Sequence, residues 1–153
     1  FVHGGLGHLA VNMLTLYFFG PVLERILGPG GFLLLYFGAE MGAHALTFVY
    51  HRDDPLYGAV GASGAISGVV FAFCLFQPFA MLLIFFAIPM PAILFAFVYV
   101  VGSIYAMQQE GQGRGGIAHE AHLGGALTGL VLTIFLEPRA LPTFLDAFRR
   151  LLG

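Results

Sequence analysis

Long apolar stretches, separated by glycine, proline and charged turns, constrain this chain more than any other feature of its sequence. A helix that crosses a bilayer needs about 20 mostly apolar residues. Five stretches approach that length, at residues 6–27, 32–50, 63–77, 91–107 and 119–136. Only 9% of the residues are charged, whereas soluble domains carry roughly 25%. The chain is therefore predicted to be all-α, a polytopic bundle of about five transmembrane helices.

Helix-breaking residues define the ends of these segments. Residues 28–30, Gly-Pro-Gly, should end the first segment, and the polar run at 51–55 should end the second. The third is short for a lipid-facing span, so we expect it to be buried among the others. Pro89 and Pro91 interrupt the fourth apolar stretch, which predicts a hydrophobic connector and then a helix from about residue 91. A polar, Gly-rich loop is expected at 108–116.

The organisation predicted is one transmembrane core, residues 1–137, followed by a C-terminal amphipathic tail, residues 138–153. The sequence starts without a signal-like segment, and we expect an N-terminal part of the natural protein to be missing. Cys74 stands alone in an apolar run, which favours a buried thiol. The net charge of −2 and the lack of a basic cluster argue against a nucleic-acid partner.

Alternation along the chain predicts that the segments starting near residues 6, 63 and 119 run in the same direction, with their N-terminal ends at one membrane face. That face carries two arginines and the opposite face four; they are Arg52 and Arg114, against Arg25, Arg139, Arg149 and Arg150. By the positive-inside rule the shared face is non-cytoplasmic. We expect a multi-pass integral membrane protein, in the cell (inner) membrane if the source is prokaryotic.

Four polar residues lie just inside this shared face, where an unsatisfied polar group is costly. His8 and Asn12 are four residues apart and so share one side of a helix. Ser63 and His122 stand at the starts of the third and fifth segments. Each has an ordinary explanation, because a serine at that position is more often a helix cap and a polar pair often joins two helices.

Glycine spacing predicts that the segments carrying Ser63 and His122 touch. Gly125 and Gly129 lie below His122, and Gly64 and Gly68 lie below Ser63, each pair four residues apart. Small residues at this spacing let transmembrane backbones approach closely. If these faces meet, the imidazole can reach the hydroxyl.

That contact would make a catalytic pair. A serine hydroxyl becomes an effective nucleophile when a base within hydrogen-bond reach takes its proton, and His122 can be that base. The tetrahedral intermediate then needs hydrogen-bond donors for its oxyanion, which His8 and Asn12 can supply. No acid is evidently placed to orient His122, so the prediction is a dyad that requires no cofactor and no metal.

Three separated motifs resemble those of the rhomboid family of intramembrane serine proteases. They are HxxxxHxxxN at residues 3–12, GxSG at residues 61–64, and AHxxGxxxG at residues 121–129. Gly20 and Glu24 also fall where the family tends to place a glycine and a buried glutamate, and Pro89 and Pro91 resemble the entry to its fifth helix. The resemblance covers nearly the whole chain from His3 to about Leu136.

The resemblance implies a six-helix core whose first helix and following loop are absent here. It assigns Ser63 as nucleophile, His122 as general base, and His8 and Asn12 to the oxyanion site, with Gly61 part of the nucleophile motif. Substrates would be single-pass transmembrane proteins that enter from the lipid bilayer near residues 95–105. One departure is Ser67, which stands where certain members carry an aromatic residue against the catalytic histidine.

Three other readings compete. An inactive rhomboid-like protein that binds membrane clients usually lacks the serine or the histidine, and both are present. A transport path through His8, Asn12, Glu40 and His44 would join different helices and depths, so these are expected to be satisfied internal groups. HEAH at 119–122 lacks the histidine spacing of a helical zinc site, and His119 and Glu120 are expected to be solvated. His3 and His51 are expected to make structural hydrogen bonds.

Overall fold

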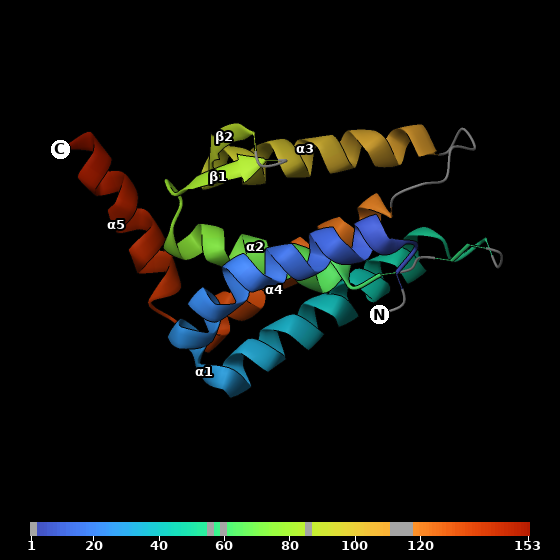
Figure 1. Cartoon of the computed structure of the whole chain (residues 1–153), viewed down its shortest axis with the longest axis horizontal. Helices are drawn as coiled ribbons and strands as arrows, with labels where there is room; N and C mark the ends of the chain where they lie inside the picture. The colour runs from blue at the N-terminus through green and yellow to red at the C-terminus, as the bar shows by residue number, and fades with distance from the viewer. Residues whose placement is uncertain (1–2, 55–56, 59–60, 85–86, 111–117) are drawn as a thin grey trace.

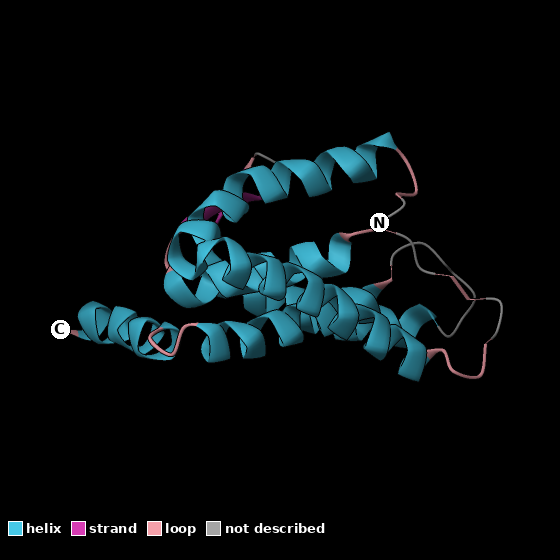
Figure 2. Cartoon of the chain, turned by 90° about the horizontal axis from the view of Figure 1, so that it is seen from below, coloured by secondary structure: helices cyan, strands magenta, loops and turns pink. Residues whose placement is uncertain are grey.

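The structure is a computed structural model, and it describes residues 3–54, 57–58, 61–84, 87–110 and 118–153. Helices dominate this part of the chain, and the strands form a single small hairpin (Figures 1 and 2). The helices are α1 (Leu6–Tyr50), α2 (Ser63–Phe76), α3 (Ala92–Glu110), α4 (His119–Leu136) and α5 (Ala140–Leu152). The strands are β1 (Met81–Ile84) and β2 (Ile88–Pro91).

Helix α1 folds back on itself at the predicted break. Gly28 has φ 72° and ψ 165°, a backbone conformation with positive φ that side chains other than glycine's rarely allow. Pro29 follows directly and cannot donate a backbone hydrogen bond. The helix therefore has two arms, residues 6–27 and 29–50, which form two limbs of a V in Figure 1.

The five long segments alternate in direction across the bundle, as the sequence predicts. The N-terminal ends of α1, α2 and α4 lie at one end, together with the C-terminal end of α3 (Figure 1). The bend of α1, the hairpin and α5 lie at the opposite end. The result is a helical bundle whose segments run back and forth between its two ends.

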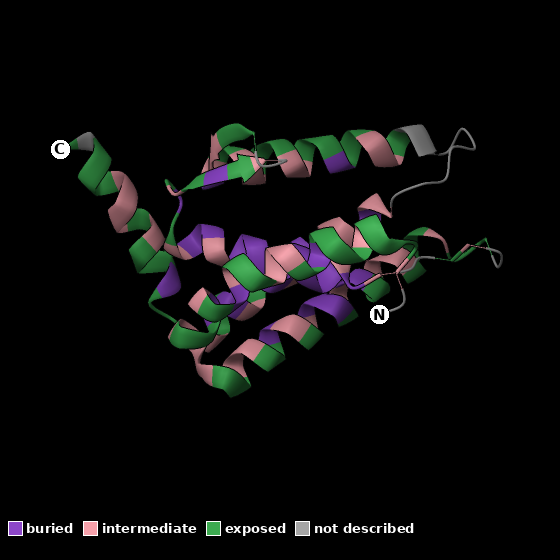
Figure 3. Cartoon of the chain, in the orientation of Figure 1, coloured by how far each residue is buried: buried purple, intermediate pink, exposed green. Residues whose placement is uncertain are grey.

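Helix α2 is the core of the bundle, which agrees with the burial expected from its shortness. Most of its residues are buried, and they form the purple centre of Figure 3. Val69 and Ala72 pack with Leu23 and Leu35 from the two arms of α1. Cys74 is also buried, as expected for a structural thiol.

Apolar side chains cover the outer surface of the bundle. Tyr17, Phe48, Phe97 and Phe135 are each more than 60% exposed, at 72, 76, 67 and 79% respectively. Water would disfavour such a surface, whereas lipid tails accommodate it. By length and composition, α1 and α4 could each cross a membrane, and α2 and α3 contribute shorter apolar helices.

Two predicted connections differ in detail from the structure. The connector before α3 is a β-hairpin in which Met81 pairs with Pro91 and Ile84 with Ile88. Helix α3 then continues to Glu110, so residues 108–110 are helical and the expected loop begins later. The remainder of that loop, with Arg114, lies outside the described residues.

The C-terminal tail forms α5, which projects from the end of the bundle farthest from Ser63 (Figures 1 and 2). A tight turn connects it to α4, and Arg139 donates two side-chain hydrogen bonds to Glu137, of 2.7 and 2.8 Å. These bonds lower the pKa of Glu137 to about 2, so its carboxylate stays ionised near neutral pH. Phe148 of α5 packs edge-on against Phe79 before the hairpin.

Candidate active site

Ser63 is the first residue of α2, and its position depends on the glycine two residues earlier. Gly61 has φ 121°, which favours glycine, and a Cβ there would lie 2.6 Å from Cε1 of His8. Glycine therefore serves both the turn and the close approach of the His8 ring. The sequence motif thus has a local structural reason as well as a chemical one.

The imidazole of His122 reaches the hydroxyl of Ser63. The Nε2–Oγ distance is 2.7 Å, and both residues are half-buried at the starts of their helices. When the hydroxyl donates to Nε2, the ring carries its proton on Nδ1, the tautomer a general base requires. Among the described residues, no carboxylate hydrogen-bonds to His122, which leaves a two-residue arrangement.

Glycines bring the two helices close enough for this bond. A Cβ on Gly125 would overlap the carbonyl of Gly64, and one on Gly129 would overlap Cα of Gly68. The backbones of α2 and α4 are therefore in direct contact, as the two glycine spacings favour. His122, one turn from Gly125, is carried to Ser63 by this contact.

Asn12 and His8 lie one turn apart on the first arm of α1, and so share one side of that helix. Asn12 is only 4% exposed, and its Nδ2 has no hydrogen-bond partner among the described residues. A buried donor without a partner costs about 1–3 kcal/mol, so its presence favours a group that acquires a partner during function. His8 lies against Gly61, and His3 packs edge-on to His8 at 5.2 Å between ring centroids.

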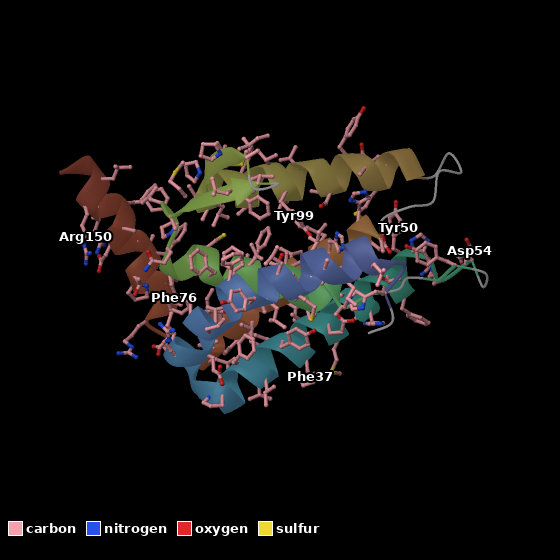
Figure 4. The ribbon with its side chains drawn as sticks, viewed as in Figure 1. Phe37, Tyr50, Asp54, Phe76, Tyr99 and Arg150 are labelled. Atoms are coloured by element: carbon pink, nitrogen blue, oxygen red, sulfur yellow. The ribbon has the colours of Figure 1, made fainter. Side chains whose placement is uncertain are left out.

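An aromatic neighbour of His122 comes from α3. The residue one turn after Ser63 on α2 is Ser67, which has no aromatic ring. Its hydroxyl lies 2.6 Å from the hydroxyl of Tyr99. The Tyr99 ring is 6.3 Å from the His122 ring, with an interplanar angle of 31°. Figure 4 shows Tyr99 extending from α3 toward the other helices. Tyr99 lies within residues 95–105, the segment near which substrates are expected to enter. Its contact with the site could not be read from the sequence.

Glu120 corrects one expectation. It was predicted to be solvated, yet it is fully buried. Its Oε1 accepts hydrogen bonds from Tyr57, at 2.7 Å, and from Thr47, at 3.3 Å. His51 also lies 3.5 Å from Oε1 and stacks on Tyr57, because the segment after α1 folds back over the start of α4. His119 is half-buried, so it too is less solvated than expected.

Three further acidic and histidine positions can be compared with the expectation, and two of them, His44 and Glu24, differ from it. Glu40 is buried, and its Oε2 accepts the backbone N–H of Ala65 at 2.8 Å. His44 hydrogen-bonds to the carbonyl of Glu40, but its side chain is 68% exposed and therefore not internal. Glu24 is exposed, so the expectation of a buried glutamate there is wrong. It lies near the bend of α1, where its side chain points away from the core.

Comparison with known proteins places these observations in a family context. Residues 1–139 match the family described as "Rhomboid domain". The chain is 31% identical to RHOMBOID-like protein 12, mitochondrial, from Arabidopsis thaliana, over 86% of this chain and 43% of that protein. It is 35% identical to the human Presenilin-associated rhomboid-like protein, mitochondrial, over 85% of this chain and 34% of that protein.

A third relative is Rhomboid protein 1, mitochondrial, from Saccharomyces cerevisiae, which is 32% identical over 86% of this chain and 38% of that protein. The chain thus spans less than half the length of these relatives. No solved structure matches it significantly. The names of these three proteins give a family and a mitochondrial location, and none of the three names an activity.

Proposed function

Because the chain belongs to the rhomboid family of membrane proteins, we propose that it is a serine endopeptidase that cleaves transmembrane segments within the bilayer. The observation that carries this proposal is the 2.7 Å contact between Ser63 Oγ and His122 Nε2. A serine that merely capped its helix would direct its oxygen at backbone N–H groups instead. Here the hydroxyl is directed at a base.

The first half of the proposed reaction forms an acyl-enzyme. Ser63 Oγ attacks the carbonyl carbon of the scissile peptide bond while His122 Nε2 takes the hydroxyl proton. The carbonyl oxygen becomes an oxyanion, for which Asn12 Nδ2 and the His8 ring are the donors. His122 then gives its proton to the leaving nitrogen as the C–N bond breaks.

The second half regenerates the enzyme. A water molecule gives a proton to His122 and attacks the ester, and the proton returns to Ser63 Oγ as the C–O bond breaks. Base catalysis of this kind typically contributes about 10²- to 10⁴-fold in rate, and each oxyanion donor about 10²- to 10³-fold. Preorganised donors are worth more in a dry, apolar site than in water.

The surroundings of the dyad support a proposal for the substrate class. The outer surface of the bundle is apolar, so a partner that approaches from the bilayer is itself a membrane segment. Within a helix the peptide carbonyls are hydrogen-bonded, so the cleaved segment must unwind at the scissile bond. We propose single-pass transmembrane proteins as substrates, with entry beside α3.

Reactivity of Ser63 toward a fluorophosphonate probe in detergent or bilayer tests this function. The wild-type chain should be labelled at Ser63, whereas Ser63→Ala and His122→Ala should lose labelling and cleavage of a model transmembrane substrate. Thr143→Ala, at an exposed site of α5, is the matched hydroxyl control and should retain both. A folded wild-type chain that binds the substrate without labelling or cleavage would instead support an inactive client-binding protein.

A further inference from the structure

We infer that Glu40 is a positioning residue that caps the helix carrying Ser63 and thereby leaves the serine hydroxyl free for His122. The inference rests on the proposed function, because it assigns a purpose to the free hydroxyl. Glu40 is on the second arm of α1, and its Oε2 accepts the N–H of Ala65, the third residue of α2, at 2.8 Å. The cap therefore comes from a different helix.

A local cap is missing at the start of α2. The first N–H groups of any helix lack intrahelical acceptors, and a side chain at the N-cap position normally supplies one. Here that position is Ala62, which has no side-chain acceptor, and its ψ of 14° departs from the extended backbone typical of a capping residue. The serine next to it makes its hydrogen bond to His122 instead.

Ser63 and Glu40 compete for the same donor. A capping oxygen accepts from the N–H two or three residues further along the helix, and for Ser63 the first of these is Ala65. If Glu40 were absent, unwinding by one residue would make Ser63 the N-cap and draw its hydroxyl toward Ala65. Because Glu40 already accepts a hydrogen bond from that N–H, the serine hydroxyl gains no capping hydrogen bond by turning away from His122.

The packing around Glu40 supports this role. Glu40 is 6% exposed, and its carboxylate lies at the positive end of the α2 dipole, where negative charge is stabilised. A Cβ on Gly64 would lie 3.2 Å from Oε2, so the carboxylate fills the space beside the helix start. Glu40 and Ser63 also line the same small cavity. The capped amide and the nucleophile are thus two residues apart at the same helix start.

The test compares variants of equal length that differ in acceptor capacity. Glu40→Gln keeps an oxygen acceptor, whereas Glu40→Met fills similar space without one. The rate of fluorophosphonate labelling at Ser63 should stay near wild type in the glutamine variant and fall roughly tenfold in the methionine variant. Equal labelling rates in the two variants would overturn the inference.

Two controls separate positioning from general stability. Glu24→Met makes the same replacement at an exposed site of α1 and should leave labelling unchanged. Leu35→Ala truncates the core on the same arm as Glu40 and should lower the unfolding temperature with little change in labelling of the folded fraction. If Leu35→Ala slows labelling as much as Glu40→Met at matched stability, Glu40 has only a structural role.

Hydrogen exchange at the Ala65 amide tests the cap independently of catalytic activity. In the wild-type chain the Ala65 amide should be protected from hydrogen exchange, and Glu40→Gln should retain that protection. These results are expected even if the wild-type chain shows no labelling, which would overturn the proposed function alone. An unprotected Ala65 amide in the wild type would overturn the cap without any variant.

Discussion

At the residue scale, the candidate site consists of ordinary side chains whose partners are unusual. Asn12 is buried with its Nδ2 unpartnered, Ser63 is at a helix start without capping it, and Glu40 caps a helix to which it does not belong. Asn12 and Ser63 thus each have a polar group available for chemistry. Glu40 makes the capping hydrogen bond that Ser63 does not make. Together they support catalysis more strongly than any one residue does.

The unpartnered amide of Asn12 gives a specific kinetic expectation. Asn12→Ala removes the donor proposed for the oxyanion and should lower kcat by about 10²- to 10³-fold with a smaller change in KM. Steady-state cleavage of a model transmembrane substrate measures both constants. Thr15→Ala, one turn further along the same arm and half-buried, is the control and should be near wild type. An unchanged kcat for Asn12→Ala would remove Asn12 from the oxyanion site.

At the element scale, the contact between α2 and α4 determines whether a dyad can exist. The two helices approach so closely at Gly64, Gly68, Gly125 and Gly129 that backbone meets backbone. Helix α3 is joined to them near the site by the Tyr99–Ser67 hydrogen bond, which holds an aromatic ring beside His122. The geometry of the site therefore depends on helix packing as much as on the four polar residues.

Enlarging Gly125 tests this dependence. The Cβ of Gly125→Ala would overlap the backbone of Gly64, so the helices must separate, at a cost of about 1–3 kcal/mol or more in the free energy of unfolding. Labelling of Ser63 should fall as well, because His122 moves with α4. Gly102→Ala is the matched control, since nothing lies within 4 Å of a Cβ there. Wild-type stability and labelling in Gly125→Ala would contradict the packing described.

At the scale of the whole molecule, most of the described arginines lie at the end of the bundle opposite the dyad, and Arg52 lies at the dyad end. The dyad lies at the end that holds the starts of α2 and α4, whereas α5 and its arginines lie at the opposite end (Figures 1 and 4). Positively charged ends tend to remain on the cytoplasmic side. We therefore expect the dyad to open toward the non-cytoplasmic side.

Cysteine accessibility tests this orientation. Asp53→Cys lies at the dyad end, and its aspartate is 91% exposed, whereas Arg150→Cys lies on α5. A membrane-impermeant maleimide added from the non-cytoplasmic side should modify the first variant in intact vesicles or cells, and the second only after permeabilisation. The parent chain, whose Cys74 is buried, serves as the blank. The reverse pattern would invert the proposed orientation.

Structural features that depend on neighbouring residues along the chain could be read from the sequence. Apolar length predicted the helical membrane bundle, Gly28 and Pro29 predicted the bend, and the glycine spacings favoured the approach of α2 to α4. Each is a property of one segment or of its periodicity, so it can be read before any packing is known.

The rotation of each helix against the others could not be read from the sequence and is set by the packing of the bundle. That rotation buries Glu120 and exposes Glu24, gives the Ala65 amide to Glu40, and brings Tyr99 beside His122. Periodicity is weak evidence for such contacts here because these helices are apolar on every side, so no polar stripe marks the face that turns to lipid. Close packing, together with the hydrogen bonds that most buried polar groups need, therefore decides these partners.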